Sequence, residues 1–166
     1  MKSSATVSNL TWLGAIAAML LCIPAMAFSI VDFTYGGRVS HFFGTQGYLD
    51  YDSDDYYAVA YPLDSLGWQF PSWVFLIGTM IGLLITIATL KRNKSPMRWL
   101  MVSMASYLAT ILALVVSWNI DYAQVDNERG QGWEGQVKVL GPGAYALLLV
   151  AMFLLVAWGS LKRQST

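Results

Sequence analysis

Four apolar stretches of 19 to 22 residues constrain the fold of this chain more than any other feature. They cover residues 10–31, 72–90, 97–118 and 143–161. A helix of about 20 residues crosses a hydrocarbon core of about 30 Å. Arg98, close to one edge, is the only charged residue in any of the four. The pattern predicts an all-α membrane protein, a four-transmembrane-helix bundle with residues 1–166 as a single integral membrane domain.

The charged residues divide between the two sides that these spans define. All ten acidic residues lie in the two outer loops, 32–71 and 119–142. Seven of the ten basic residues lie in the tails, in the turn 91–96 or at Arg98. Because basic residues accumulate in cytoplasmic segments, we expect both termini inside, the acidic loops outside, and a plasma-membrane location.

The four spans are predicted to form two helical hairpins that resemble each other in sequence. The first hairpin leaves the membrane at Val31-Asp32-Phe33 and the second at Ile120-Asp121-Tyr122. A true duplication and a chance likeness of apolar helices with basic ends both remain open. The first outer loop has strand-like composition at 56–61 and at 33–35. We therefore expect a small extracytoplasmic β-hairpin or sheet from this loop on the outer helix ends, and a more irregular second loop.

Small residues in the middle two spans are candidates for a helix-packing interface. Gly78 and Gly82 form a GxxxG motif, and Ala105 and Ala109 have the same spacing. Two glycines four residues apart leave a flat groove that lets another helix approach closely. Packing within the bundle is the favoured interpretation over packing against another subunit.

The deepest polar side chains in the spans carry hydroxyl groups. They are Thr86, Ser103, Ser106, Tyr107 and Thr110. Such groups bond to their own backbone or to a neighbouring helix. Their pattern favours a role in holding helices together over a polar conduction path.

One acidic run in the first outer loop resembles the start of a calcium loop. Alternating carboxylates can wrap a hard cation, and they are supplied here by Asp50, Asp52, Asp54 and Asp55. An EF-hand needs Gly at its sixth position and Glu at its twelfth, where this chain has Asp55 and Tyr61. A solvated acidic turn is therefore favoured, and a weak calcium site remains open. No other cofactor is predicted.

These features favour a non-catalytic integral membrane subunit, or an interaction and scaffolding protein, that packs against a partner membrane complex. Its expected partners are the lipid bilayer and other membrane subunits in a hetero- or homo-oligomer, without nucleic acid, and we expect no enzymatic activity. The alternative is an oligomeric cation-selective pore or an extracellular calcium sensor that uses the acidic outer face. A third possibility is an enzyme subunit whose active site is completed by another chain.

Overall fold

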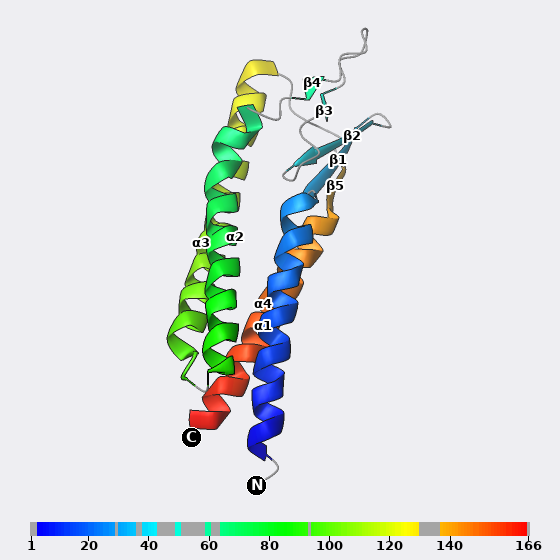
Figure 1. Ribbon diagram of the computed structural model, residues 1–166. Coiled ribbons are helices and arrows are strands. Elements are labelled where there is room, and N and C mark those ends of the chain that lie inside the picture. Colours follow the sequence, from blue (N-terminus) through cyan, green and yellow to red (C-terminus); the bar gives the residue numbers. More distant parts are fainter. Residues whose placement is uncertain are drawn as a thin grey trace.

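Four long helices account for most of the computed structural model (Figure 1). They are α1 (Ser3–Ala27), α2 (Asp64–Lys91), α3 (Met97–Arg129) and α4 (Pro142–Ser165). The structure describes residues 3–28, 30–35, 38–42, 49–50, 59–60, 64–92, 94–129 and 137–165, with side chains for 9–28, 30, 70–92, 94–116 and 140–163.

Each helix contains one segment that is long and apolar enough to cross a membrane. These segments are Asn9–Ala27, Phe70–Lys91, Met97–Val116 and Pro142–Arg163. They match the four predicted spans to within a few residues. The prediction of four membrane-compatible helices is thus confirmed by length and composition.

The helix ends differ from the predicted span ends. α1 stops at Ala27, and the chain is extended from Val31, because Gly141 N donates a hydrogen bond to Ile30 O at 2.9 Å. α3 instead continues to Arg129, 11 residues beyond the predicted span. Residues 119–129 contain no glycine or proline, so the sequence has no helix breaker there. At 33 residues α3 is about 50 Å long, more than a bilayer core of about 30 Å requires.

Five short strands lie in the segments that connect the helices at the end opposite the chain termini (Figure 1). They are β1 (Val31–Tyr35), β2 (Arg38–Phe42), β3 (Leu49–Asp50), β4 (Val59–Ala60) and β5 (Val137–Leu140). β1 lies between β2 and β5 and is antiparallel to both, and β3 pairs with β4. The second connecting segment, expected to be irregular, therefore supplies both β5 and the end of α3.

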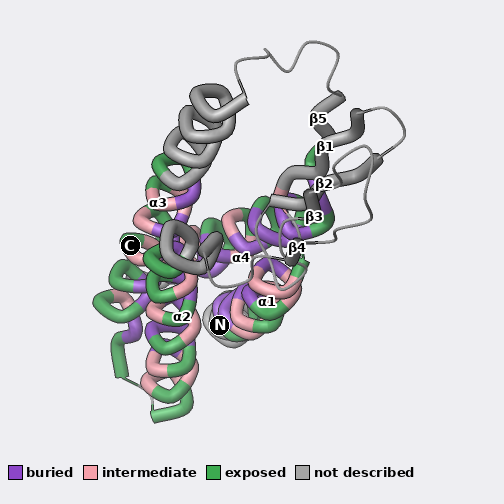
Figure 2. Tube along the Cα trace, turned by 90° about the horizontal axis from the view of Figure 1, so that it is seen from above, coloured by how far each residue is buried: buried purple, intermediate pink, exposed green. Residues whose placement is uncertain are grey.

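The helices pack as two pairs that differ from the two predicted hairpins. α1 packs mainly against α4, and α2 mainly against α3, as Figures 1 and 2 show from two directions. α1 makes a smaller contact with α2, and α3 touches α4 only slightly. The largest helix contacts therefore do not follow the two predicted hairpins. The register of β1 with β5 joins the end of α1 to the start of α4, and a short turn joins α2 to α3.

The bundle core follows a seven-residue repeat in every helix. In each helix, one series of buried positions is separated alternately by three and four residues. They are Thr11, Ala15, Ala18, Cys22 and Ala25 in α1; Ser72, Leu76, Thr79, Leu83 and Thr86 in α2; Leu100, Ser103, Tyr107, Thr110 and Leu114 in α3; and Leu147, Val150, Leu154, Ala157 and Leu161 in α4. This spacing is typical of helices that pack at small crossing angles with a left-handed twist.

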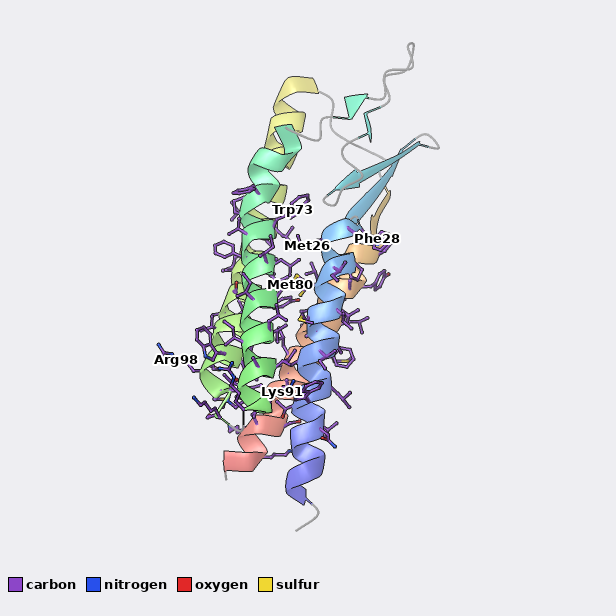
Figure 3. All side chains as sticks on the ribbon, viewed as in Figure 1. Met26, Phe28, Trp73, Met80, Lys91 and Arg98 are labelled. Atoms are coloured by element: carbon purple, nitrogen blue, oxygen red, sulfur yellow. The ribbon has the colours of Figure 1, made fainter. Side chains whose placement is uncertain are left out.

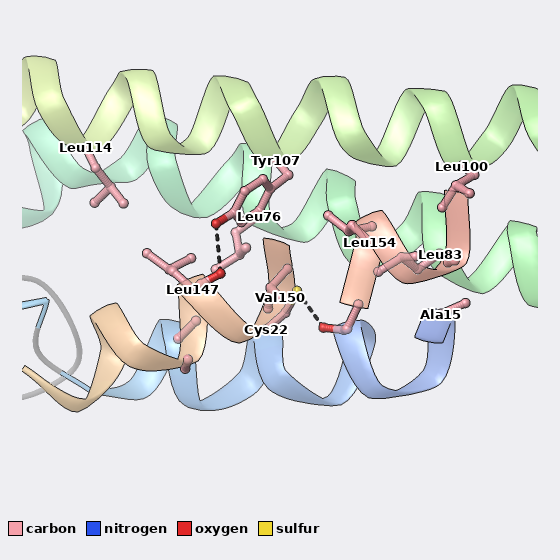
Figure 4. Close-up of a cluster of buried hydrophobic side chains, with 14 of the residues drawn as sticks. Ala15, Cys22, Leu76, Leu83, Leu100, Tyr107, Leu114, Leu147, Val150 and Leu154 are labelled. Carbon is pink, nitrogen blue, oxygen red and sulfur yellow. Dashed lines mark hydrogen bonds between the residues drawn. The ribbon is translucent and has the colours of Figure 1, made fainter. Parts of the chain in front are cut away.

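The size of the buried residues differs between helices, and this sets how closely they approach. α1 buries only small side chains, whereas α4 also buries the larger Leu147, Val150, Leu154 and Leu161. A Cβ atom added to Gly14 of α1 would lie 3.0 Å from Phe153 O and 3.2 Å from Ala157 Cβ of α4. The α1 and α4 backbones are therefore nearly in contact. Figure 4 shows Ala15 facing the larger Leu83 and Leu154 in one layer of this core.

We predict that Gly14→Val separates α1 from α4. The added side chain would meet backbone atoms that cannot rotate away, so the bundle should lose about 1–3 kcal/mol of stability. Gly159→Val in α4 is the matched control, because a Cβ there has nothing within 4 Å. The measurement is unfolding of each purified variant by sodium dodecyl sulfate titration in detergent. Equal stability of the two variants would contradict close packing at Gly14.

Candidate functional site

Hydroxyl groups recur at every seventh residue along the buried faces of α2 and α3. Ser72, Thr79 and Thr86 are fully buried in α2, and Ser103 and Thr110 are fully buried in α3. Leucines alternate with them in α2, at Leu76 and Leu83. The middle of the bundle therefore holds a regular set of polar groups, which a hydrocarbon interior cannot hydrate.

Most of these hydroxyl groups donate to the carbonyl one turn earlier in their own helix. Thr79 Oγ1 donates to Phe75 O at 3.0 Å, and Thr86 Oγ1 donates to Gly82 O at 2.8 Å. In α3, Ser103 Oγ bonds Trp99 O at 3.0 Å and Thr110 Oγ1 bonds Ser106 O at 3.1 Å. The thiol of Cys22 is placed likewise, 3.3 Å from Ala18 O. Ser72 Oγ is an exception, because it is buried without a hydrogen-bond partner.

Two hydroxyl groups bond to a different helix. Ser106 Oγ of α3 donates to Phe75 O of α2 at 2.7 Å, which joins the two members of one pair. Tyr107 OH of α3 donates to Leu147 O of α4 at 2.8 Å, in a buried position. Figure 4 shows the Tyr107 side chain crossing from α3 to α4 beside Leu76 and Val150. This bond links the α2/α3 pair to the α1/α4 pair.

The glycines of the GxxxG motif face serines of α3. A Cβ at Gly78 would lie 2.7 Å from Ser106 Oγ, and a Cβ at Gly82 would lie 3.3 Å from Ser103 Cβ and even closer to its Oγ. The glycines thus leave room for the serine side chains.

The alanines with the same spacing are not the residues that face the glycines. Ala105 is exposed, and Ala109 is half-buried. Ser103 belongs with Thr110 to the seven-residue series of hydroxyl residues, which is a sequence signal for this partner. Ser106 lies outside that series, so the spacing does not identify it.

The predicted calcium ligands lie almost entirely beyond the described residues. Asp50 belongs to β3, opposite Val59, while Asp52, Asp54 and Asp55 fall outside the described part of the chain. Within the described part of the chain, no group of three or more His, Cys, Asp or Glu could hold a metal ion. The calcium site and the cation pore that would use these carboxylates stay predictions.

Apart from Ser72 Oγ, the buried hydroxyl groups described above donate to backbone carbonyls. The two bonds that reach another helix, from Ser106 and Tyr107, hold the helices together. The chain matches no protein-family model, no curated protein and no solved structure.

We predict that Gly78 and Ser106 are energetically coupled. Gly78→Ala should destabilise the bundle, because the new methyl group would meet an Oγ that is fixed by its bond to Phe75 O. Ser106→Ala should cost about 0.6 kcal/mol for one lost bond within a membrane. In the double variant the two methyl groups would be 3.8 Å apart, which is an ordinary contact. The double variant should therefore lose less stability than the two single variants lose together.

The measurement is a double-mutant cycle on unfolding in detergent, and the expected coupling is about 0.5–3 kcal/mol. The control cycle pairs Ser106→Ala with Gly159→Ala, whose added Cβ touches nothing. That cycle should be additive. Additivity in the Gly78 cycle as well would contradict the contact.

Proposed function

We propose that this chain is a non-catalytic integral membrane subunit that binds a partner membrane complex through its outer connecting segments. The observation that supports a scaffolding role is the use of the buried hydroxyl groups. Thr79, Thr86 and Ser103 donate to carbonyls of their own helices, so their polar groups are satisfied in the interior. Ser106 and Tyr107 donate to carbonyls of α2 and α4, which fixes these helices relative to α3. A rigid bundle of this kind can hold a binding surface in a fixed orientation.

We place the binding surface on the sheet formed by β2, β1 and β5. β1 pairs with β2 from its own connecting segment and with β5 from the other, so both segments would contribute to one surface. The bond from Gly141 N to Ile30 O ties this sheet to the ends of α1 and α4. The outer strands β2 and β5 each have an edge to which a partner strand could add.

The helix faces are assigned to the bilayer rather than to the partner. Gly78 and Gly82 already face α3, so the glycine groove is occupied within the bundle. The exposed side chains of the spans are large and apolar, among them Leu108, Leu112 and Leu148. Lipid acyl chains cover such residues without a specific partner. In this proposal the termini are cytoplasmic, the sheet lies outside and the membrane is the plasma membrane, on the basis of the charge distribution.

We predict that Thr34→Pro releases the partner. Thr34 lies in the central strand, opposite Val39 on one side and Val137 on the other. Proline has no N–H group and is excluded from central strands, so it should disrupt the sheet while leaving the four helices inserted. The measurement is gentle detergent extraction from native membranes through a C-terminal tag, followed by native mass spectrometry.

The unmodified chain should be recovered with a partner of fixed stoichiometry, and Thr34→Pro should be recovered without it. Thr34→Val is the matched control, because valine keeps the N–H group and suits a strand, and it should retain the partner. Recovery of the unmodified chain alone, or only with copies of itself, would contradict the proposal. Retention of the partner by Thr34→Pro would place the binding surface elsewhere.

A further inference from the structure

The end of the bundle opposite the sheet carries an exposed set of basic side chains. They come from the end of α2, the following turn, the start of α3 and the end of α4: Lys91, Arg92, Lys94, Arg98, Lys162 and Arg163. We call this set the basic end; Figure 3 shows its members Lys91 and Arg98 at the same end of the molecule. The residues whose side chains are described include no Asp or Glu.

Part of the basic end is explained by the helices themselves. The C-terminus of a helix carries a partial negative charge that attracts cations. Lys91 lies in the last turn of α2, and Lys162 and Arg163 lie in the last turn of α4. Their positions stabilise the helices that carry them.

Lys94 N donates a hydrogen bond to Thr89 O at 3.0 Å, so Lys94 still belongs to the C-terminal end of α2. Arg98 has no such explanation. α3 begins at Met97, and its first turn contains no acidic residue. The N-terminus of a helix carries a partial positive charge, so a cation there is repelled and an anion is attracted. Arg98 lies inside this first turn, and Lys94 lies three residues before it. An anion bound from outside the chain would relieve this repulsion.

The aromatic residues around the basic end indicate where that anion comes from. Trp12 and Trp99 are 38% and 37% exposed, although both are large apolar side chains. Lys162 Nζ lies 5.3 Å above the centre of the Trp158 ring, which lies in the same part of α4. Tryptophan is enriched at the depth of the lipid headgroups. Basic side chains and tryptophans at the same end of the bundle are typical of a membrane interface. They are less typical of a site that binds a free anion from water.

We propose that the basic end binds anionic phospholipid headgroups, with Arg98 as the residue that depends most on the lipid phosphate and Lys94 as its neighbour in the turn before α3. Each Lys or Arg near an anionic leaflet strengthens binding about fivefold. The charges are spread over the ends of three helices, which suits several headgroups of one leaflet better than a single small ligand. This surface is separate from the sheet, so the proposal is independent of the partner complex.

The test uses the purified full-length chain in a neutral detergent. Phosphatidylglycerol or phosphatidylcholine with identical acyl chains is titrated, and bound lipids are counted by native mass spectrometry. The unmodified chain should bind phosphatidylglycerol more tightly, and added NaCl should reduce the preference. Lys94→Gln with Arg98→Gln should lower phosphatidylglycerol affinity about 25-fold, from two charges at about fivefold each.

The matched control is Arg38→Gln with Lys138→Gln, which removes the same charge from β2 and β5 at the opposite end. It should keep the lipid preference. If the first double variant is not recovered folded, Lys162→Gln with Arg163→Gln replaces it and should also weaken the preference. Equal affinity for the two lipids, or an equal loss in both charge variants, would overturn the proposal. So would displacement of the lipid by inorganic phosphate at the same concentration, which would indicate a free-anion site.

Discussion

Close backbone approach between helices is the constraint on which the rest of this structure depends. Lipid and leucine are equally apolar, so helices in a membrane gain little from the hydrophobic effect and associate through packing and hydrogen bonds. Gly14 brings α1 to α4, and Gly78 and Gly82 bring α2 to α3. The short separation between α2 and α3 is also what lets Ser106 reach Phe75 O. The small residues therefore determine both the pairing of the helices and the interhelical hydrogen bond within one pair.

The hydroxyl groups of the interior follow from the same constraint. A threonine or serine whose Oγ donates to its own helix presents a small, satisfied side chain, and it fills a buried position without leaving an unpaired polar group. Thr79, Thr86, Ser103 and Thr110 all do this, between leucines that supply bulk. Tyr107 reaches from one helix pair to the other. The local bonds thus satisfy the buried hydroxyl groups, and the bonds from Ser106 and Tyr107 join the helices.

The sequence predicted what depends on hydropathy and charge, and it failed where long-range contacts decide. The four spans are visible because each is an uninterrupted apolar run, and the basic end follows from Lys and Arg at the run edges. The pairing of α1 with α4 was not predicted, because it depends on β5 joining β1 across more than 100 residues. The GxxxG motif is visible in the sequence, and Ala105 and Ala109 share only its four-residue spacing. The residues that face the glycines are Ser103 and Ser106, as the distances from a Cβ added to each glycine show.

Disulfide cross-linking in native membranes tests the pairing of α1 with α4 and α2 with α3 most directly. In a chain with Cys22→Ala, the pair Gly14→Cys with Ala157→Cys would have Cβ atoms 3.2 Å apart, and Gly78→Cys with Ser106→Cys would have them 3.8 Å apart. Disulfides need about 3.5–4.5 Å, so the Gly78/Ser106 pair fits directly and the Gly14/Ala157 pair fits once the two helices move slightly apart. Both pairs should cross-link on mild oxidation, whereas Gly14→Cys with Ser106→Cys, on helices of different pairs, should not. Failure of the α1–α4 pair, or efficient cross-linking of the mixed pair, would contradict this arrangement.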